Sequence, residues 1–318
     1  MDIVSLKSKM PVIRHVPGFK KIRRIVNGFC KDSWLQYVMR RRPDRYADYL
    51  YEGAFGYRID WQHPRDLNEW INYLAFKTDT SEWSRLADKF EVRNFVSERG
   101  LSHILLPLYG KWENPSDIDF DALPNSFAIK TNSGCGDTIL VADKTKSSPS
   151  EIRQKLWLAL ANRDEIFRMS AELHYLAINQ LVVCEQLIPP PYVVDYKIWC
   201  FHGEPFGILT CSNRDKQTHH LDLAMYDLEW IRHDEWMTND YKNDVEVEKP
   251  KHFDKMLEYA KILSSGFPEV RVDFYDTPEQ VYFGEMTFTS CCGRMPYYTS
   301  EILKIMGEKI ELGFDNNQ

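Results

Sequence analysis

The spacing of apolar and polar residues changes near residue 110 from a helical to a strand-like pattern. Before that point the pattern predicts helices over residues 19–50, 67–76 and 81–100, the last ending at Gly100. After it, short apolar or alternating runs between turn residues predict strands, interrupted by helices over 149–161 and 253–263. The predicted strands are 127–131, 138–141, 180–187, 192–201, 205–211, 270–275 and 281–288. This order of elements predicts an α+β fold with a helical N-terminal region.

Charge divides the chain further. Residues 1–45 contain twelve lysines and arginines and three aspartates, a local charge of +9, whereas the whole chain carries −7 and the remainder therefore −16. We predict three parts: a basic helical N-terminal arm (1–60), a helical N-terminal lobe (61–110) and an α+β body (111–318). The acidic body argues against a general nucleic-acid-binding protein.

Two interpretations of the basic arm stay open. Its positive charge favours peripheral association with an anionic surface, either the inner leaflet of a membrane or an acidic glycan. Its apolar residues, spaced by three and four, equally suit a helix that packs on its own protein. These residues are Phe19, Ile22, Ile25, Val26 and Phe29.

Composition limits the class of protein and its location. Hydrophobic residues make up 43% of the chain, which is ordinary for a globular protein, and no run approaches the roughly 20 apolar residues of a membrane span. The N-terminus lacks the apolar core of a signal peptide, and the odd number of cysteines, seven, fits a reducing compartment. We therefore expect a cytoplasmic protein, with peripheral contact to the inner membrane face as the one addition.

The predicted hairpin of residues 271–287 carries the strongest chemical signal. A turn centred on Pro278 pairs Asp273 with Phe283 and Arg271 with Glu285. Since alternate side chains of a strand share a face, Arg271, Asp273, Glu285 and Thr287 are expected on one face. Two carboxylates and a hydroxyl oxygen suit Mg²⁺, and an arginine beside them suits a phosphoryl group. The alternative is a cross-strand ion pair on a solvated face.

A second signal is a lysine, Lys130, at the end of an apolar strand, followed by a loop of small residues with Ser133, Gly134 and Gly136. Glycines let backbone N–H groups approach phosphate oxygens, and the lysine adds a positive charge. The pattern is neither a Walker A motif nor GxGxxG. A hairpin with glycines in its turn is the alternative.

Three weaker signals complete the set. The strand 181–188 ends near Glu185, where a chain leaving the sheet presents backbone groups to an adenine edge. Arg214 follows a strand end and is a candidate for contact with an anionic substrate. Asp119-Phe120-Asp121 has the form of the DxD metal motif of glycosyltransferases, although no nucleotide-binding βαβ unit precedes it.

In this order, the segments resemble the ATP-grasp superfamily, and more narrowly the teichuronopeptide-biosynthesis (TupA-like) branch found with bacterial surface-polysaccharide genes. The resemblance covers roughly residues 67–289. Its most specific text is Gly266-Phe267-Pro268-Glu269-Val270-Arg271-Val272-Asp273-Phe274-Tyr275 followed by Gly284-Glu285-Met286-Thr287-Phe288. Further matches are Leu86–Arg93, Leu123–Phe127, Asp195–Lys197, Phe201–Pro205 and Tyr226–Trp230. The resemblance implies an ATP-grasp fold, in which two α+β lobes clasp ATP.

The resemblance also assigns roles. Lys130 would contact ATP phosphates, with Ser133, Gly134 and Gly136 as the closing loop. Glu185 and Leu187 would line the adenine site, Lys197 would be a second nucleotide-side lysine, and Asp195 a ribose-side residue. Asp273 and Glu285, with Thr287 beside them, would hold Mg²⁺, and Arg271 would stabilise the transferred phosphoryl group.

Two departures from the family pattern concern the metal and the substrate. Thr287 stands where many ATP-grasp enzymes have asparagine. The segment Ser290-Cys291-Cys292-Gly293-Arg294 replaces the usual proline-glycine text, and Arg294 becomes a second candidate for substrate contact.

The implied reaction is ligation with ATP and Mg²⁺ as cofactors. A carboxylate attacks the γ-phosphate, and an amine then displaces phosphate from the acyl phosphate. We expect a small-molecule or glycan substrate, such as a sugar carboxylate joined to an amino acid or amino sugar. The alternatives are a sugar kinase on the same fold, a glycosyltransferase, and a nucleotide-binding regulator; the intact Lys130, Asp273 and Glu285 argue against the regulator.

Overall fold

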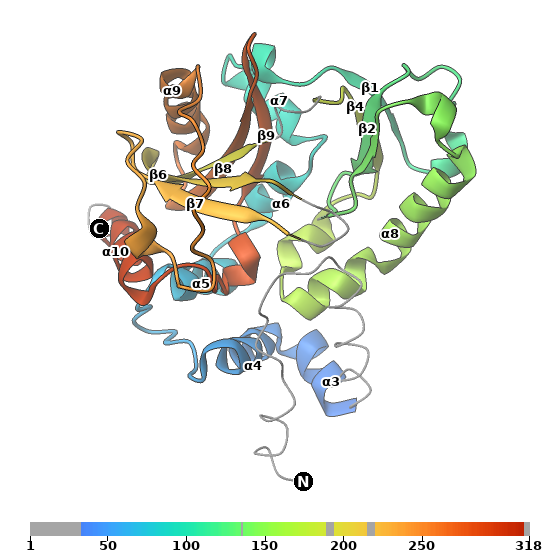
Figure 1. Ribbon diagram of the computed structural model, residues 1–318. Helices are drawn as coiled ribbons and strands as arrows, with labels where there is room; N and C mark the ends of the chain where they lie inside the picture. Colours follow the sequence, from blue (N-terminus) through green and yellow to red (C-terminus); the bar gives the residue numbers. More distant parts are fainter. Residues whose placement is uncertain (1–32, 135, 189–193, 215–219, 315–318) are drawn as a thin grey trace.

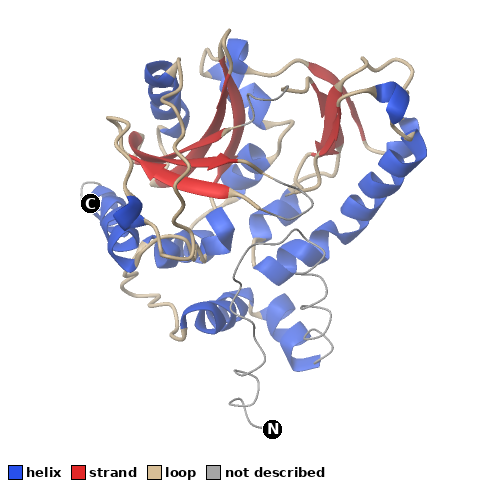
Figure 2. Ribbon diagram, in the orientation of Figure 1, coloured by secondary structure: helices blue, strands red, loops and turns tan. Residues whose placement is uncertain are grey.

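The computed structural model describes residues 33–134, 136–188, 194–214 and 220–314 (Figure 1). It contains two antiparallel sheets with helices packed around them (Figure 2). The helices are α3 (Ser33–Arg41), α4 (Pro43–Phe55), α5 (Leu67–Lys77), α6 (Ser81–Ala87), α7 (Val92–Glu98), α8 (Pro149–Ser170), α9 (Phe253–Ser264) and α10 (Ser300–Phe314). The strands are β1 (Leu108–Trp112), β2 (Phe127–Thr131), β3 (Ile139–Val141), β4 (Val182–Glu185), β5 (Asp195–Phe201), β6 (Glu204–Ser212), β7 (Asp222–Tyr226), β8 (Glu269–Asp276) and β9 (Val281–Thr287). Within the described residues, no helix is long and apolar enough to cross a bilayer.

The small sheet has the strand order β1-β4-β2-β3 and is covered on one face by α8 (Figure 1). Phe127 and Ile129 of β2 and Cys184 of β4 pack there against Ile152 and Leu156 of the helix. Because side chains alternate along a strand, Lys130 and Glu185 lie on the opposite face. The small sheet therefore presents its polar face away from α8.

The large sheet has the order β7-β6-β5-β8-β9 and is covered on both faces. Helix α9 packs on one face, where Ile198 of β5 and Val272 of β8 are fully buried. Helices α5 and α10 pack on the other, around Trp199 and Phe201 of β5. The charged residues Asp195 and Lys197 share this second face, at the other end of β5.

Most predicted elements are present, but the single helix over 81–100 is wrong. The helix stops at Ala87 and α7 starts at Val92. The Asp88 carboxylate accepts hydrogen bonds from the backbone N–H of Phe90 (2.8 Å) and from the side chain of Asn132 (2.9 Å), and the Lys89 N–H donates to the Asn132 carbonyl (2.8 Å). These bonds tie the break to the small sheet, so a tertiary contact overrides the local helical pattern. Gly100, with φ +79°, follows the last turn as predicted.

Other differences are additions. Strands β1 and β7 and helix α10 were not predicted, and α8 runs to Ser170 rather than to residue 161. The predicted helix over 19–50 is broken at Arg42, because Pro43 starts α4, and its residues 19–32 lie outside the described part. Strand β1 starts at Leu108, beside the predicted boundary, and the division into three parts stays a prediction.

Candidate functional site

The hairpin of β8 and β9 carries the predicted acidic residues in a different register from the predicted one. In the structure Asp273 lies opposite Glu285, and Arg271 lies opposite Thr287. The predicted pairs, Asp273 with Phe283 and Arg271 with Glu285, are therefore wrong. The prediction that the four polar side chains share a face is confirmed by their hydrogen bonds to one another.

Two local features explain this register. Asp276 pairs with Val281, and this pairing, continued along the ladder, would set Gly284 opposite Asp273 and turn Glu285 to the other face. A β-bulge between Asp273 and Phe274 absorbs one residue of β9 and restores Glu285 to the face of Asp273. A Cβ on Gly284 would lie 3.0 Å from the Asp273 carbonyl oxygen, so glycine suits this close approach.

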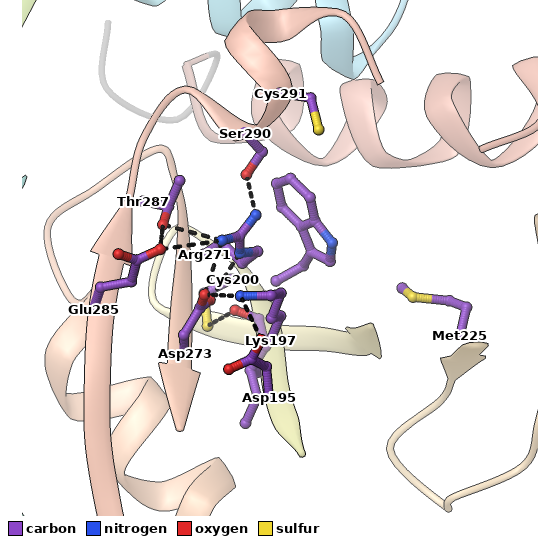
Figure 3. A network of polar contacts seen from close by, with 12 residues as sticks. Asp195, Lys197, Cys200, Met225, Arg271, Asp273, Glu285, Thr287, Ser290 and Cys291 are labelled. Carbon is purple, nitrogen blue, oxygen red and sulfur yellow. Dashed lines mark hydrogen bonds and ion pairs between the residues drawn. The ribbon is translucent and has the colours of Figure 1, made fainter. Parts of the chain in front are cut away.

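Arg271 is the centre of a buried polar network (Figure 3). Its guanidinium donates two hydrogen bonds to the Asp273 carboxylate (2.7 and 2.8 Å), and single bonds to the hydroxyls of Thr287 (3.1 Å) and Ser290 (2.9 Å). The Thr287 hydroxyl donates in turn to Glu285 (3.2 Å), whose Oε1 lies 3.6 Å from Arg271 Nη2. A forked pair of this kind fixes the guanidinium plane, so Arg271 is held rigidly beside both carboxylates.

Strand β5 adds a lysine and a third carboxylate to the same face. Lys197 forms an ion pair with Asp273, and its ammonium lies 3.9 Å from Asp195. Burial and the charge of Arg271 lower the pKa of Lys197, but the negative charges of Asp273 and Asp195 together outweigh them and raise it above its usual value. Burial likewise raises the pKa of Asp195, and the charges of Lys197 and Arg214 bring it below its usual value. Both groups are therefore charged in the folded protein.

The small sheet supplies the predicted lysine and glutamate. Lys130 and Glu185 lie on adjacent strands, diagonally across the β2–β4 ladder, and form an ion pair in which both side chains are nearly buried. The loop after β2 is tight, because the Asp137 carboxylate accepts hydrogen bonds from the backbone N–H and the hydroxyl of Thr131. These two side chains occupy the space that a Cβ on Gly134 would need. The predicted loop residues and Lys130 are therefore at the same end of β2.

Lys89 is a site residue that the sequence analysis missed. Its ammonium donates to the Gly134 carbonyl of the small sheet's loop (2.9 Å) and lies 3.8 Å from Glu285 Oε2 of the large sheet. It thus joins the two sheets through their polar groups. The polar pair Asp88-Lys89 interrupts the apolar spacing, but the surrounding residues predict a continuous helix. In such a helix Lys89 would be an ordinary surface lysine.

Glu285 is the carboxylate on which these cations converge. Enclosure by the protein alone raises its pKa, but the charges of Lys89, Lys197, Arg271 and Lys130 outweigh this and lower it to about 2. Its side chain is 40% exposed, whereas that of Asp273 is 5% exposed. Glu285 is therefore ionised and accessible, which suits a ligand to a cation.

The remaining predicted residues lie at the margins. Arg214 is half exposed and donates to Asp195 (2.7 Å). Arg294 follows the turn Ser290–Gly293 and donates to the Ser170 carbonyl at the end of α8 (3.3 Å). Leu187 is half-buried just beyond β4. In the Asp119-Phe120-Asp121 segment, Asp119 accepts a bond from the Asp121 N–H (3.0 Å), so it forms a local turn.

The donor set fits Mg²⁺ bound together with a nucleotide. Among the described residues, no group of three or more His, Cys, Asp or Glu side chains gathers to hold a metal. Mg²⁺ does not require such a group, because it binds through one or two carboxylates plus substrate phosphates. Asp273 and Glu285 are opposed carboxylates, and Lys89, Lys130 and Lys197 supply positive charge for phosphates beside them.

Several solved structures are similar to the chain at low sequence identity. No curated protein matches the chain. Similar solved structures include a D-alanine–D-alanine ligase from Bacillus anthracis (16% identity, 74% of this chain and 70% of that one, TM-score 0.41). They also include the ATP-grasp ligase PsnB in complex with a precursor variant, Mg and ADP (11%, 94% and 77%, TM-score 0.42). An L-amino acid ligase from Bacillus licheniformis shares 12% identity, with coverages of 69% and 47% and a TM-score of 0.43.

The family comparison covers most of the molecule. The model of the TupA-like ATP-grasp family matches residues 69–311, about three quarters of the chain, and includes both sheets and every site residue described above. The chain belongs to the TupA-like ATP-grasp family.

Proposed function

We propose that this protein is an ATP- and Mg²⁺-dependent ligase that joins a carboxylate to an amine through an acyl phosphate. One observation carries the proposal: the ionised Glu285, opposite Asp273, is surrounded by four cations that come from both sheets and from the α6–α7 break. This arrangement suits a polyanion bound between the sheets together with a divalent cation. Phosphoryl transfer depends on position and charge and needs no nucleophile from the protein.

The nucleotide would lie between the two sheets. Lys130 and Lys89 would contact its phosphates from the small-sheet side and Lys197 from the large sheet. The loop with Ser133, Gly134 and Gly136 would close over the phosphates, because the Ser133 hydroxyl is buried without a hydrogen-bond partner in the described part of the chain. Glu185 and Leu187, where β4 leaves the sheet, would border the adenine. Asp195 would lie toward the ribose.

Asp273 and Glu285, with the Thr287 hydroxyl, would hold Mg²⁺. When bound, the ion neutralises charge on the phosphoryl oxygens. Arg271 does the corresponding work from the protein: four hydrogen bonds hold its guanidinium still, so it stabilises the transferred phosphoryl group at no cost in reorganisation. The chain's contribution is therefore position and charge.

In the proposed reaction, a substrate carboxylate oxygen attacks the γ-phosphorus and ADP leaves. An amine nitrogen then attacks the acyl carbon, inorganic phosphate leaves, and the nitrogen loses a proton. We propose a sugar carboxylate and an amino acid or amino sugar as substrates, in the synthesis of a bacterial capsule or cell-surface polysaccharide. Arg214, half exposed beside Asp195, and Arg294, which bonds to the Ser170 carbonyl, would receive an anionic substrate.

The test is ADP release by the purified protein with uronic acids crossed against amino acids and amino sugars. A ligase releases ADP only when both a carboxylate and an amine are present. ADP release with a sugar that lacks a carboxylate would instead indicate a sugar kinase on the same fold. Protection against heat by nucleotide sugars, with none by ATP, would indicate a glycosyltransferase and overturn the proposal.

A matched pair of variants ties the activity to this site. Glu285→Gln keeps the shape of the side chain and removes its charge, so ADP release is expected to be lost. Glu279→Gln makes the same change in the exposed turn of the same hairpin and is expected to have no effect. Equal rates of ADP release in both variants would show that the charged residues of the hairpin form only an ordinary ion pair.

A further inference from the structure

A second charged surface lies outside the proposed site, on α3 and the start of α4. One side of α3 is apolar: Leu35, Val38 and Met39 pack against Tyr46 and Ala47 of α4 and against Met169 at the end of α8. Tyr37, Arg40 and Arg41 share the other side, because residues three and four apart lie on one face of a helix. We call these three residues, with Arg45 in the first turn of α4, the basic face.

The basic face is open to solvent. Tyr37 is 62% exposed, among the highest values for a large apolar side chain in the described residues. Arg41 and Arg45 are exposed, and their side chains have no hydrogen bond or ion pair within the described part of the chain. The side chain of Arg40 bonds to Glu165 (2.9 Å) and remains half exposed. The face therefore offers free guanidinium groups beside an exposed aromatic ring.

The part of the chain that precedes this face in the sequence is also basic. Residues 1–32, which lead into α3, contain eight lysines and arginines and two aspartates, whereas residues 46–318 carry a net −16. Figure 1 places α3 and α4 at one end of the molecule, below both sheets. A partner bound there would leave the space between the sheets accessible.

We propose that the basic face docks the protein on the surface of a lipid bilayer that contains anionic lipids. Guanidinium groups pair with lipid phosphates in a forked geometry, and arginine stems and tyrosine rings suit the boundary between head groups and acyl chains. The exposed ring of Tyr37 beside Arg41 and Arg45 favours a bilayer over a soluble polyanion. A soluble polyanion needs only the positive charges, whereas a bilayer also takes up the ring. The protein would thus work next to a membrane without crossing it.

The test is co-sedimentation of the full-length protein with two kinds of vesicle, one of phosphatidylcholine alone and one of phosphatidylcholine with about 30% phosphatidylglycerol. About one anionic lipid in three gives the second vesicle a clear negative surface potential. The double variant Arg41→Glu/Arg45→Glu is expected to bind the anionic vesicles about thirtyfold or more weakly. Binding of the unaltered protein is expected to weaken at high salt, because salt screens exposed charges.

The control variant is Lys242→Glu/Lys255→Glu, which makes the same change in net charge at two exposed lysines outside α3 and α4. It is expected to bind like the unaltered protein, and thermal unfolding checks that both variants are folded. Equal binding by the two double variants, or equal binding of the unaltered protein to neutral and anionic vesicles, would overturn the proposal.

Tyr37→Ser separates a bilayer from a soluble polyanion. It is expected to weaken vesicle binding about fivefold, the effect of burying part of one aromatic ring, and to leave binding to soluble dextran sulfate unchanged. An equal loss on both, or no loss on vesicles, would assign the face to a soluble polyanion and refute membrane docking.

Discussion

Glu269, the first residue of β8, lets the structure predict a pH-dependent change in stability. Its side chain is fully buried opposite Phe201, and neither carboxylate oxygen has a hydrogen-bond partner within the described residues. Burial raises its pKa well above the usual value, and the charge of nearby Arg271 lowers it by less. The folded protein therefore holds Glu269 as a neutral acid.

The sign and size of the effect follow from linkage. In the unfolded chain this glutamate ionises near pH 4.3, whereas in the folded protein it stays protonated to a higher pH. Folding thus binds a proton, and the folded state loses about 1.4 kcal/mol of stability for each pH unit between the unfolded and folded pKa values. Glu269→Gln removes this loss, because the amide is neutral at every pH and has the same shape.

The measurement is urea unfolding, followed by tryptophan fluorescence, at pH 5.5, 6.5 and 7.5. The free energy of unfolding of Glu269→Gln, minus that of the unaltered protein, is expected to rise with pH, by about 1.4 kcal/mol for each pH unit that lies below the raised pKa of Glu269. The change of this difference with pH is diagnostic. The desolvation cost of a buried amide does not depend on pH, so it shifts the difference by a constant amount. Glu279→Gln, in the exposed turn of the hairpin, is expected to give a flat difference. A flat difference for Glu269→Gln as well would refute the reasoning.

Three further predictions concern the site. ATP with Mg²⁺ is expected to raise the melting temperature, since a ligand at 100 times its Kd stabilises the folded state by about 2.7 kcal/mol; a flat thermal-shift titration, with nucleotide sugars active instead, would contradict ATP binding. Asp273→Asn is expected to abolish Mg²⁺-dependent ADP release and also to lower stability by about 3 kcal/mol, because Arg271 and Lys197 lose a buried counter-charge; near-normal release in the folded variant would contradict this. Gly284→Ala is expected to reduce ADP release more than it reduces the melting temperature, because its Cβ crowds the bulge that aligns Glu285; unchanged release would show that the bulge tolerates the methyl group.

The chemistry of the hairpin could be predicted from the sequence, but its register could not. The period of two places Arg271 and Asp273 on one face whatever the partner strand does. Which residues oppose them depends on the loop and on the bulge at Gly284, and a slip of one residue would have turned Glu285 away. The pairing of Asp276 with Val281 shifts the register by one residue from the predicted one, and the bulge shifts it by one more. Together the two shifts return Glu285 to the predicted face, although the predicted pairs are wrong.

Lys89 shows the opposite case. Its neighbours Leu86, Phe90 and Val92 have helical spacing, and local propensity alone predicts a helix through them. The helix ends because Asp88 bonds to Asn132, a residue more than forty positions away that follows β2. Contacts of this range are absent from any local window of sequence, and both the break and the position of Lys89 depend on them.

The ion pairs of the site explain how its charges are kept buried before any ligand arrives. Lys130 is paired with Glu185, Lys197 with Asp273, and Arg271 with Asp273. A buried charge without a partner is strongly destabilising, so these pairs hold the cations in place at an acceptable cost. In the proposed function a Mg²⁺ ion would take Asp273 and Glu285 while nucleotide phosphates would take Lys197 and Lys89. Lys130 and Arg271 would keep their carboxylate partners, because each has further N–H groups to offer a phosphate. The exchange replaces one set of neutralised charges by another, so an anion or a cation arriving alone would leave half of the site unpaired. Nucleotide and Mg²⁺ are therefore expected to bind with positive coupling, which calorimetric titration of ATP with and without Mg²⁺ measures; equal affinities would refute the exchange.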